Sequence, residues 1–299
     1  MNLSQIELLR TLHENGFNLS KAADSMHIVQ SAVSRQLHLF EEELGSPLLT
    51  RNGKKLTGLT ELGQKVLAQA STIQQAKKNI KSLASEYRNG DSGILHVATT
   101  HTQAKYFLPK PIQRFRAKYP GVKVYIVQSS PDHLIDFLHN DQADLAICTE
   151  KVAEDETLII NPCYEWHHAV VIPKEHPLAS GDLTLERLAS FPILTYSLGF
   201  TGRSNIEKAF NDRELQMDVV LAAADTDIIK TYVRLGLGVG LIASMAYDPI
   251  ADTDLVVRNL PGLIPSSMTK IAYLRQNYLP AYSRHFIEEL LDAAQEMNA

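Results

Sequence analysis

The sequence predicts an α/β protein in three parts: an N-terminal winged helix-turn-helix, a long linking helix, and a two-lobed domain of alternating strands and helices. Three observations predict this class. Residues 18–44 have the apolar spacing of two crossing helices, and residues 60–87 repeat apolar side chains as coiled coils do. From Gly93 onward, short apolar runs alternate with amphipathic segments, which predicts βαβ units. At 299 residues the chain has length for more than one domain.

Residues 18–44 form the predicted helix-turn-helix. Ala22 and Ala23 are small enough for two helix backbones to cross closely. An apolar stripe on the second helix comprises Val33, Leu37, Phe40 and Leu44. The other face begins with short or planar hydrogen-bonding side chains, the kind that reach base edges and phosphates in a major groove: Gln30, Ser31, Ser34, Arg35 and Gln36. We expect this helix to bind double-stranded DNA rather than to form a purely structural hairpin.

The segments around these helices complete the expected DNA-binding head, residues 1–59. A first helix from Ser4 to Asn15 is expected to open with a Ser4–Glu7 capping box. After Gly45, a hairpin around Asn52-Gly53 forms the wing, because Asn-Gly suits a two-residue turn. Its basic residues are Arg51, Lys54 and Lys55. Arg51 and Lys54 are candidate contacts to the DNA backbone, although a solvated basic turn is equally consistent with Lys54 and Lys55.

A long helix, capped by Thr60, is expected to link the head to the rest of the chain over residues 60–90. Apolar residues recur along it at alternating intervals, as in a coiled coil: Leu62, Val66, Ile73, Ala76, Ile80, Leu83 and Tyr87. Such a seam needs a partner, and the same helix of a second subunit would pair two DNA-binding heads. We therefore expect a homodimer. Asn89 to Gly93 form the linker that ends the helix.

The remaining residues, 91–299, are expected to fold as two similar lobes with a cleft between them. The strand and helix order predicts parallel sheets with crossover helices. Expected strands are 94–99, 122–127, 144–148, 169–172, 193–195, 239–242, 255–257 and 271–274, and expected helices are 111–119, 131–140, 203–211, 225–235 and 281–296. The first lobe takes about 91–162 and 267–299, and the second about 163–266.

Charge and composition indicate a cytoplasmic globular protein. The net charge is −5, but residues 1–88 hold 11 Lys and Arg against 8 Asp and Glu, so the expected head is the basic part. No apolar run reaches the length of about 18 residues that a membrane helix needs, and the N-terminus lacks the order of a signal peptide. Two cysteines without a CxxC spacing fit a reducing compartment.

Signals for catalysis or metal binding are weak. Gly236, Gly238 and Gly240 follow a helix and precede a strand, the reverse of a dinucleotide-binding fingerprint, so close packing or a strained turn is the better interpretation. His101 and the pair His167-His168 have no third ligand at metal spacing, which favours a surface or hydrogen-bonding role. The three residues from Glu41 to Glu43 are expected to form a solvated face or a subunit contact. A two-lobed cytoplasmic enzyme remains an alternative, but no catalytic constellation supports it.

The head carries motifs that resemble those of the LysR-type transcriptional regulators. These are Ala22-Ala23, residues 30–36 (QSAVSRQ), Leu44-Gly45, Arg51 and residues 59–63 (LTELG). The resemblance spans the whole chain and implies an effector-binding domain that looks like a periplasmic solute-binding protein. It also implies a DNA-binding regulator without a cofactor, assembled as a dimer and further as a homotetramer, with RNA polymerase as a partner.

Three blocks are more specific: residues 98–109 (ATTHTQAKYFLP), 195–204 (TYSLGFTGRS) and 227–249. They resemble the CysB/Cbl branch, which governs sulfur-assimilation genes; a LysR-type regulator of another pathway is the alternative. Departures from that branch are Val29, Ser31, Leu49, Ser129, Ser197 and Leu198. The resemblance implies an effector such as sulfate, O-acetylserine or N-acetylserine, bound between the lobes by Thr100, Thr102, Gln103, Thr149, Trp166 and Thr201. Trp166 also suits a core position, and Arg203 suits either ligand charge or structure.

Overall fold

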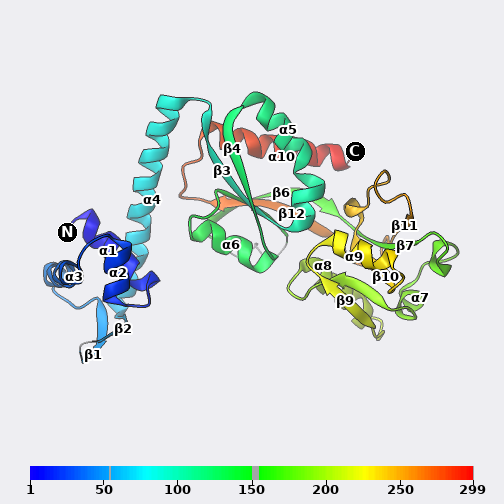
Figure 1. The fold of residues 1–299 in the computed structure, drawn as a ribbon, viewed down its shortest axis with the longest axis horizontal. Coiled ribbons are helices and arrows are strands. Elements are labelled where there is room, and N and C mark those ends of the chain that lie inside the picture. The colour runs from blue at the N-terminus through cyan, green and yellow to red at the C-terminus, as the bar shows by residue number, and fades with distance from the viewer. Residues whose placement is uncertain (54, 150–154, 299) are drawn as a thin grey trace. The chain divides into compact units, whose positions relative to one another are not determined.

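The computed structural model describes residues 1–53, 55–149 and 155–298 (Figure 1). Its contacts divide the chain into two compact units, one of residues 1–84 with 276–278 and one of residues 85–275 with 279–299. The helices of the described residues include none that is long and apolar enough to cross a bilayer. Lys54, a candidate DNA contact, lies outside the described residues.

The first unit is a winged helix-turn-helix. Its elements are α1 (Leu3–Glu14), α2 (Leu19–Ser25), α3 (Gln30–Leu44), β1 (Leu49–Asn52) and β2 (Lys55–Leu59), and α4 (Glu61–Asn89) follows. Leu8, Leu9, Val33 and Phe40 are fully buried in its core. Val33, Leu37 and Phe40 of the apolar stripe predicted on α3 are therefore buried, whereas Leu44, its last predicted member, is 37% exposed.

Helix ends in this unit are set by capping residues. Asn18 caps α2, and Gly45, with φ +70°, ends α3. The predicted Ser4–Glu7 capping box is wrong: α1 starts at Leu3, and its capping box joins Asn2 to Gln5. The predicted Asn52-Gly53 turn is also displaced, because Asn52 still pairs with Lys55 in the strand ladder, and of Asn52 and Gly53 it is Gly53 that has a positive φ.

The predicted seam along α4 divides into two stretches. Leu62, Val66 and Ile73 pack against the core of the winged helix-turn-helix itself. Ile80, Leu83 and Tyr87 are 66%, 47% and 95% exposed. The expectation of one continuous intermolecular seam is therefore wrong for its first half, because the small head uses the start of α4 to complete its own core.

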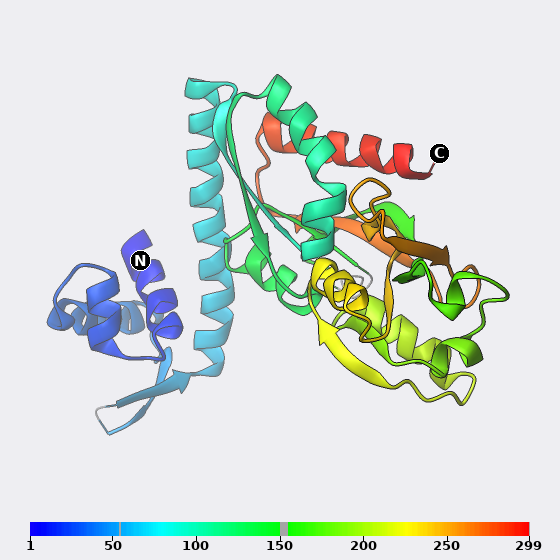
Figure 2. The same ribbon diagram turned by 45° about the vertical axis from the view of Figure 1, so that its right-hand side comes forward.

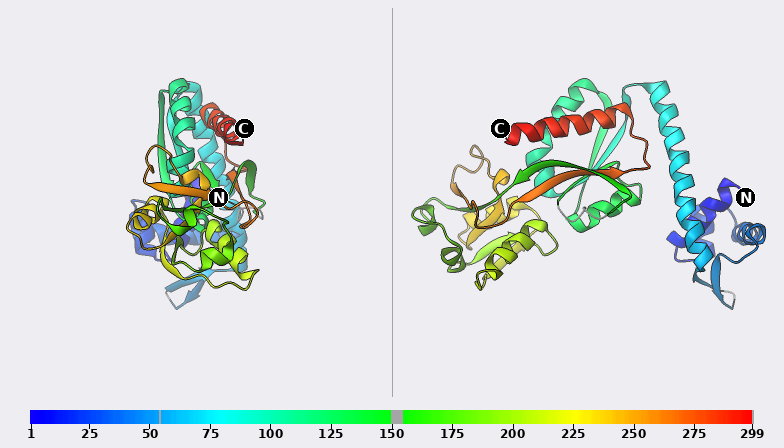
Figure 3. Two further views of the ribbon diagram at one scale, coloured as in Figure 1. Left: turned by 90° about the vertical axis from the view of Figure 1, so that its right-hand side faces the viewer. Right: turned by 180° about the vertical axis from the view of Figure 1, so that it is seen from behind.

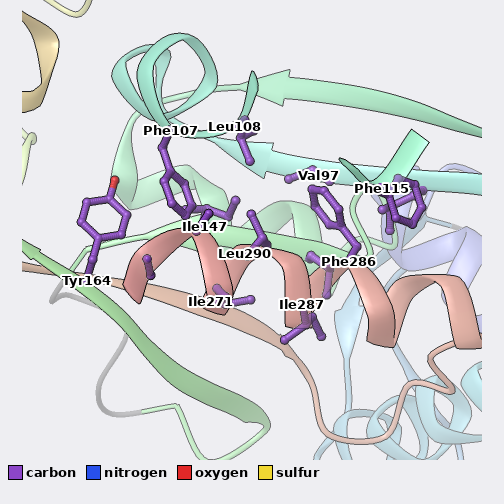
Figure 4. Packing of buried hydrophobic residues seen from close by; sticks show 14 of the residues in the cluster. Val97, Phe107, Leu108, Phe115, Ile147, Tyr164, Ile271, Phe286, Ile287 and Leu290 are labelled. Carbon is purple, nitrogen blue, oxygen red and sulfur yellow. The ribbon is translucent and has the colours of Figure 1, made fainter. Parts of the chain in front are cut away.

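The second unit contains two lobes, each built on a five-stranded mixed sheet (Figure 2). In lobe I the strand order is β4-β3-β5-β12-β6, with β3 (Ser92–Thr99), β4 (Gly121–Gln128), β5 (Leu145–Cys148), β6 (Leu158–Trp166) and β12 (Ser267–Leu274). The π-helical turn η1 (Gln103–Phe107), α5 (Pro109–Lys118), α6 (Pro131–His139) and α10 (Ala281–Asn298) complete it. Figure 4 shows Phe286 and Leu290 of α10 beside Val97 and Ile147 of the sheet.

Lobe II repeats this plan. Its strand order is β11-β7-β10-β8-β9, with β7 (His168–Pro173), β8 (Ile193–Tyr196), β9 (Val219–Ala223), β10 (Val239–Ala243) and β11 (Leu255–Asn259). Its helical elements are η3 (Pro177–Ala179), α7 (Leu185–Ala189), α8 (Thr201–Asn211), α9 (Thr226–Arg234) and η4 (Ser244–Ala246). Phe210 of α8 and Val233 of α9 belong to different core clusters of the lobe.

Two strands, β6 and β9, are absent from the sequence-based expectation. β6 pairs antiparallel with β12 along its whole length, and these two strands lead toward lobe II (Figure 3). Pro162 makes β6 look unlike a strand, but the register shifts at that point and β6 lies at the sheet edge, where proline is tolerated. β9 is also an edge strand, and two of its five residues are exposed.

The glycine-rich segment 236–240 is a packing feature, as expected. A Cβ at Gly238 would lie 2.2 Å from the Pro192 carbonyl oxygen. Only glycine lets the chain pass this close to the start of β8.

Candidate functional site

A cavity lies between the two lobes at the carboxyl ends of their strands. Thr100 follows β3 and Thr149 follows β5 in lobe I, while Tyr196 ends β8 and Ala243 ends β10 in lobe II. The other lining residues are Thr102, Gln103, Pro131, Trp166, Phe200, Thr201 and Gly202. This is the edge at which open α/β sheets usually bind ligands.

The cavity is small. It offers about 40 Å³ to water-sized molecules. One water needs about 10–15 Å³ by the same measure, so the space suits a ligand of a few heavy atoms, such as a tetrahedral oxyanion.

Its polar groups are uncharged. Thr100, Gln103, Thr149 and Thr201 are each at least nine-tenths buried. Among the described lining residues none bears a carboxylate, an ammonium or a guanidinium group. Hydroxyl, amide and indole groups can hold an anion by hydrogen bonds alone, without an ion pair.

Two threonine pairs join the lobes beside the cavity. The Thr102 hydroxyl lies 3.1 Å from the Thr226 hydroxyl, and the Thr149 hydroxyl lies 2.5 Å from the Thr201 hydroxyl. Each pair takes one partner from each lobe. A ligand that bonds to these hydroxyls would therefore contact both lobes at once.

Two lining side chains differ in how they are held. Gln103 donates to the Thr269 hydroxyl at 3.2 Å and accepts from the Tyr164 hydroxyl, so its amide is fixed. Trp166 is 7% exposed and belongs to the lobe I core, but its indole Nε1 is buried without a hydrogen-bond partner among the described residues. An unpaired buried donor costs free energy, so a ligand that accepts a hydrogen bond from Nε1 would gain affinity.

All six candidate ligand residues from the sequence, Thr100, Thr102, Gln103, Thr149, Trp166 and Thr201, line this one cavity. Arg203 does not line it; its guanidinium pairs with Glu207 at 2.8 Å. Sequence reasoning missed Pro131, Tyr196, Phe200, Gly202 and Ala243. Tyr196 and Ala243 could have been found from the sequence, because they end strands 193–196 and 239–243, whose carboxyl ends share one sheet edge.

The expected surface role holds for one histidine of the pair and is wrong for the other. His167 is exposed, as expected for a surface residue. His168 is 1% exposed, and neither of its ring nitrogens has a hydrogen-bond partner among the described residues. Residues 168–172 of β7 are all buried, so His168 lies in a strand that is covered on both faces, which the HH pair alone did not reveal.

On α3, four of the five candidate DNA contacts are exposed: Gln30, Ser31, Ser34 and Arg35. Gln36 is half-buried, and its Oε1 atom is buried without a partner in the described structure. Arg51 is exposed but pairs with Glu41 at 2.9 Å. Lys54, the remaining candidate, belongs to the residues that the structure does not describe.

Glu41 corrects the interpretation of the acidic run. Its Oε1 accepts hydrogen bonds from the backbone N–H groups of Leu48 and Leu49, and its Oε2 from Arg51. Only 11% of its side chain is exposed. Glu41 therefore joins α3 to the wing, whereas Glu42 and Glu43 remain exposed.

Two family models match the chain. The bacterial regulatory helix-turn-helix protein, lysR family, matches residues 3–64, and the LysR substrate binding domain matches residues 88–295. The chain is a LysR-type transcriptional regulator. The alternative of a two-lobed enzyme is therefore wrong, because both matched models describe parts of a regulator.

This LysR-type regulator is similar to several proteins along nearly its whole length. It is 43% identical to the HTH-type transcriptional regulator SsuR of Burkholderia cenocepacia, over 96% of this chain and 94% of that protein. It is 40% identical to CysB of Haemophilus influenzae, over 96% of this chain and 89% of that one. The crystal structure of the cofactor-binding domain of the Cbl transcriptional regulator aligns with a TM-score of 0.65 at 37% identity, covering 70% of this chain and 93% of that chain.

Proposed function

We propose that this LysR-type regulator controls sulfur-assimilation genes in response to a small effector bound between its lobes. The similarity to proteins named SsuR, CysB and Cbl supports the pathway. The effector we propose is sulfate, with O-acetylserine and N-acetylserine as the related candidates.

The observation that best supports a small anion as the effector is the lining of the cavity, which is uncharged, rich in hydrogen-bond donors and encloses little space. Threonine hydroxyls, the Gln103 amide and the free indole N–H of Trp166 converge there without a described carboxylate to repel an anion. The N-terminal turn of α8 adds Gly202 to the lining. The N-cap residue of this helix, Phe200, has no side-chain acceptor for the first backbone N–H groups. A helix N-terminus favours negative charge.

Binding would act on DNA by favouring one arrangement of the lobes. The Thr102–Thr226 and Thr149–Thr201 pairs bring donors from both lobes to the same ligand. An effector shifts the conformational equilibrium only by its difference in affinity for the two states. A ligand that needs both lobes meets this condition, because separated lobes cannot supply all the contacts.

For the DNA partner, we propose that Gln30, Ser31, Ser34 and Arg35 on α3 bind double-stranded DNA in a promoter. The exposed stretch of α4 around Ile80 and Leu83 is a suitable contact for a second subunit, and a homotetramer would assemble from such dimers. RNA polymerase is the expected further partner, and the cytoplasm the expected compartment.

The experiment that tests the effector site is the double substitution Thr100→Val and Thr102→Val in the full chain. These changes keep the shape of the side chains and remove two hydroxyls. Sulfate binding, measured by calorimetry, should fall by at least about tenfold, since each lost hydrogen bond costs about 1 kcal/mol or more. Binding to DNA in gel retardation should be unchanged in the absence of effector.

The matched control is Thr253→Val, because Thr253 is exposed and lies in lobe II away from the cavity lining. This variant should bind sulfate as the wild type does. Unchanged sulfate affinity in the double variant would show that the effector binds elsewhere.

A further inference from the structure

His168 is a buried ionisable residue that the proposed effector site does not use. It begins β7, directly after the crossover from lobe I, and is 1% exposed. Backbone groups of Gly202 and Pro265 lie close enough to the ring to raise its pKa, but neither ring nitrogen meets full hydrogen-bond geometry within the described part of the chain. A buried imidazole that is bonded so weakly is unusual, because each poorly paired polar atom costs free energy.

The ring lies directly behind the cavity lining. The ring centroids of His168 and Trp166 are 5.0 Å apart. A Cβ at Gly202 would lie 3.1 Å from Nε2 of His168. On the neighbouring strand β10, Ala243 is the register partner of His168. Trp166, Gly202 and Ala243 all line the cavity, so only one layer of atoms separates the imidazole from a bound ligand.

The charged side chains near His168 are directed to other partners or to solvent, so none of those described here forms an ion pair with its ring. The adjacent His167 is exposed, and on β6 the Glu165 carboxylate bonds to Ser266. On α8 the Arg203 guanidinium is paired with Glu207. On β8 the Tyr196 hydroxyl bonds to the Ala243 N–H, while β10 and the segment around Pro265 bring no ionisable group to the ring. Burial therefore dominates and lowers the pKa of His168 to about 4.

We propose that His168 takes up a proton from solvent when a divalent oxyanion fills the cavity, so that the regulator binds this anion more tightly as the pH falls. The inference rests on the proposed effector site. A doubly negative ligand within one layer of atoms stabilises the imidazolium cation, and burial strengthens the attraction. By reciprocity, the proton stabilises the bound anion equally. His168 thus acts as a positioning residue that favours ligands of higher negative charge.

The test measures sulfate binding to the full chain by calorimetry at pH 7 and pH 5. Sulfate keeps its double negative charge over this range, so any change in affinity with pH arises from protonation of the protein. We expect the affinity to rise about tenfold between pH 7 and pH 5, which corresponds to a rise of about two units in the pKa of His168 when sulfate binds. Repeating the titration in buffers of different ionisation enthalpy should show proton uptake on binding.

Two variants assign the proton. In His168→Gln the pH dependence should vanish while sulfate still binds at pH 7; His168→Asn serves as a second neutral variant should the first fold poorly. His167→Gln, the adjacent exposed histidine, should keep the full pH dependence. The fluorescence of Trp166, the single tryptophan of the chain, adds a direct signature. A protonated imidazole quenches indole, so sulfate at pH 5 should quench the wild type but not His168→Gln.

The outcomes separate the two claims. Sulfate binding with equal affinity at both pH values, or a pH dependence that persists in both His168 variants, would overturn the role of His168 alone. An absence of sulfate binding at both pH values would overturn the oxyanion site and this inference together.

Discussion

The Tyr106 hydroxyl donates a 2.6 Å hydrogen bond to the Asp227 carboxylate and thereby joins lobe I to lobe II. Lys105 pairs with the same carboxylate, and Lys230 donates to the Tyr106 oxygen at 2.8 Å. Burial and the Asp227 carboxylate raise the pKa of Tyr106, so the phenol remains a donor. Tyr106 and Gln103 lie on the same π-helical turn, which places this bridge and the effector cavity on one short element.

Removing this hydroxyl should favour open lobes. Tyr106→Phe loses the bond to Asp227 but keeps the ring, and a hydrogen bond to a charged group contributes about 1.5–3 kcal/mol. We expect sulfate affinity, measured by calorimetry, to fall about tenfold. Tyr125→Phe, at an exposed tyrosine on β4, is the control and should bind normally. Equal affinities in both variants would mean that the bridge does not influence binding.

Glu41 should stabilise the junction between α3 and the wing. Glu41→Ala leaves the Leu48 and Leu49 N–H groups without their acceptor and frees Arg51. We expect a local loss of about 2 kcal/mol, equivalent to about thirtyfold faster amide exchange at Leu48 and Leu49. Hydrogen exchange of the full chain measures it. Glu42→Ala, at the adjacent exposed carboxylate, should exchange like the wild type; equal protection in Glu41→Ala would contradict this assignment.

Arg35 should contribute to DNA affinity directly. It is exposed on α3, opposite the buried Val33 and Leu37. Arg35→Ala should weaken binding to a duplex selected by the wild type from a random pool, by about 1–3 kcal/mol if Arg35 contacts a base. Lys65→Ala, at an exposed lysine on α4 paired with Glu61, should change the affinity little. Equal losses in the two variants would indicate a general charge effect and no specific contact.

His168 should also make folding stability depend on pH. Its pKa is lowered to about 4 in the folded chain, whereas an unfolded histidine titrates near 6.5. Between these values the unfolded chain binds the proton and the folded chain does not, so stability is lost as the pH falls. From pH 7 to pH 5 the loss attributable to His168 is about 2 kcal/mol.

Urea unfolding followed by Trp166 fluorescence, in chloride buffers free of sulfate, measures this loss. His168→Phe should unfold with a smaller difference between pH 7 and pH 5 than the wild type, and His167→Gln should behave as the wild type does. An identical pH dependence in His168→Phe would show that another group is responsible.

Periodicity and strand order were enough to predict the winged head, the long helix and the two-sheet domain. The expectation of parallel sheets is wrong for β6, β7, β11 and β12, which pair antiparallel. The stripe through Val33, Leu37 and Phe40 forms the core that its spacing predicted. The strand ends near Thr100 and Thr149 lie at one cavity, because the carboxyl ends of parallel strands share an edge.

The remaining features depend on contacts that no local pattern contains. β6 was missed because Pro162 suggests a loop until its pairing with β12 is known. Glu41 looked like part of an acidic surface, but its partners are supplied by the wing after the chain has turned. The bridge from Tyr106 to Asp227 arises only when the two lobes come together.

The most direct test of the central claim is thermal unfolding of the full chain, followed by Trp166 fluorescence, with sulfate, thiosulfate, O-acetylserine, N-acetylserine and an unrelated aromatic acid. The single tryptophan lies in the effector unit, so the signal reports that unit. A ligand at about 100 times its Kd stabilises the folded state by about 2.7 kcal/mol. We predict a higher midpoint with sulfate or an acetylserine. A higher midpoint only with the aromatic acid would contradict the sulfur assignment.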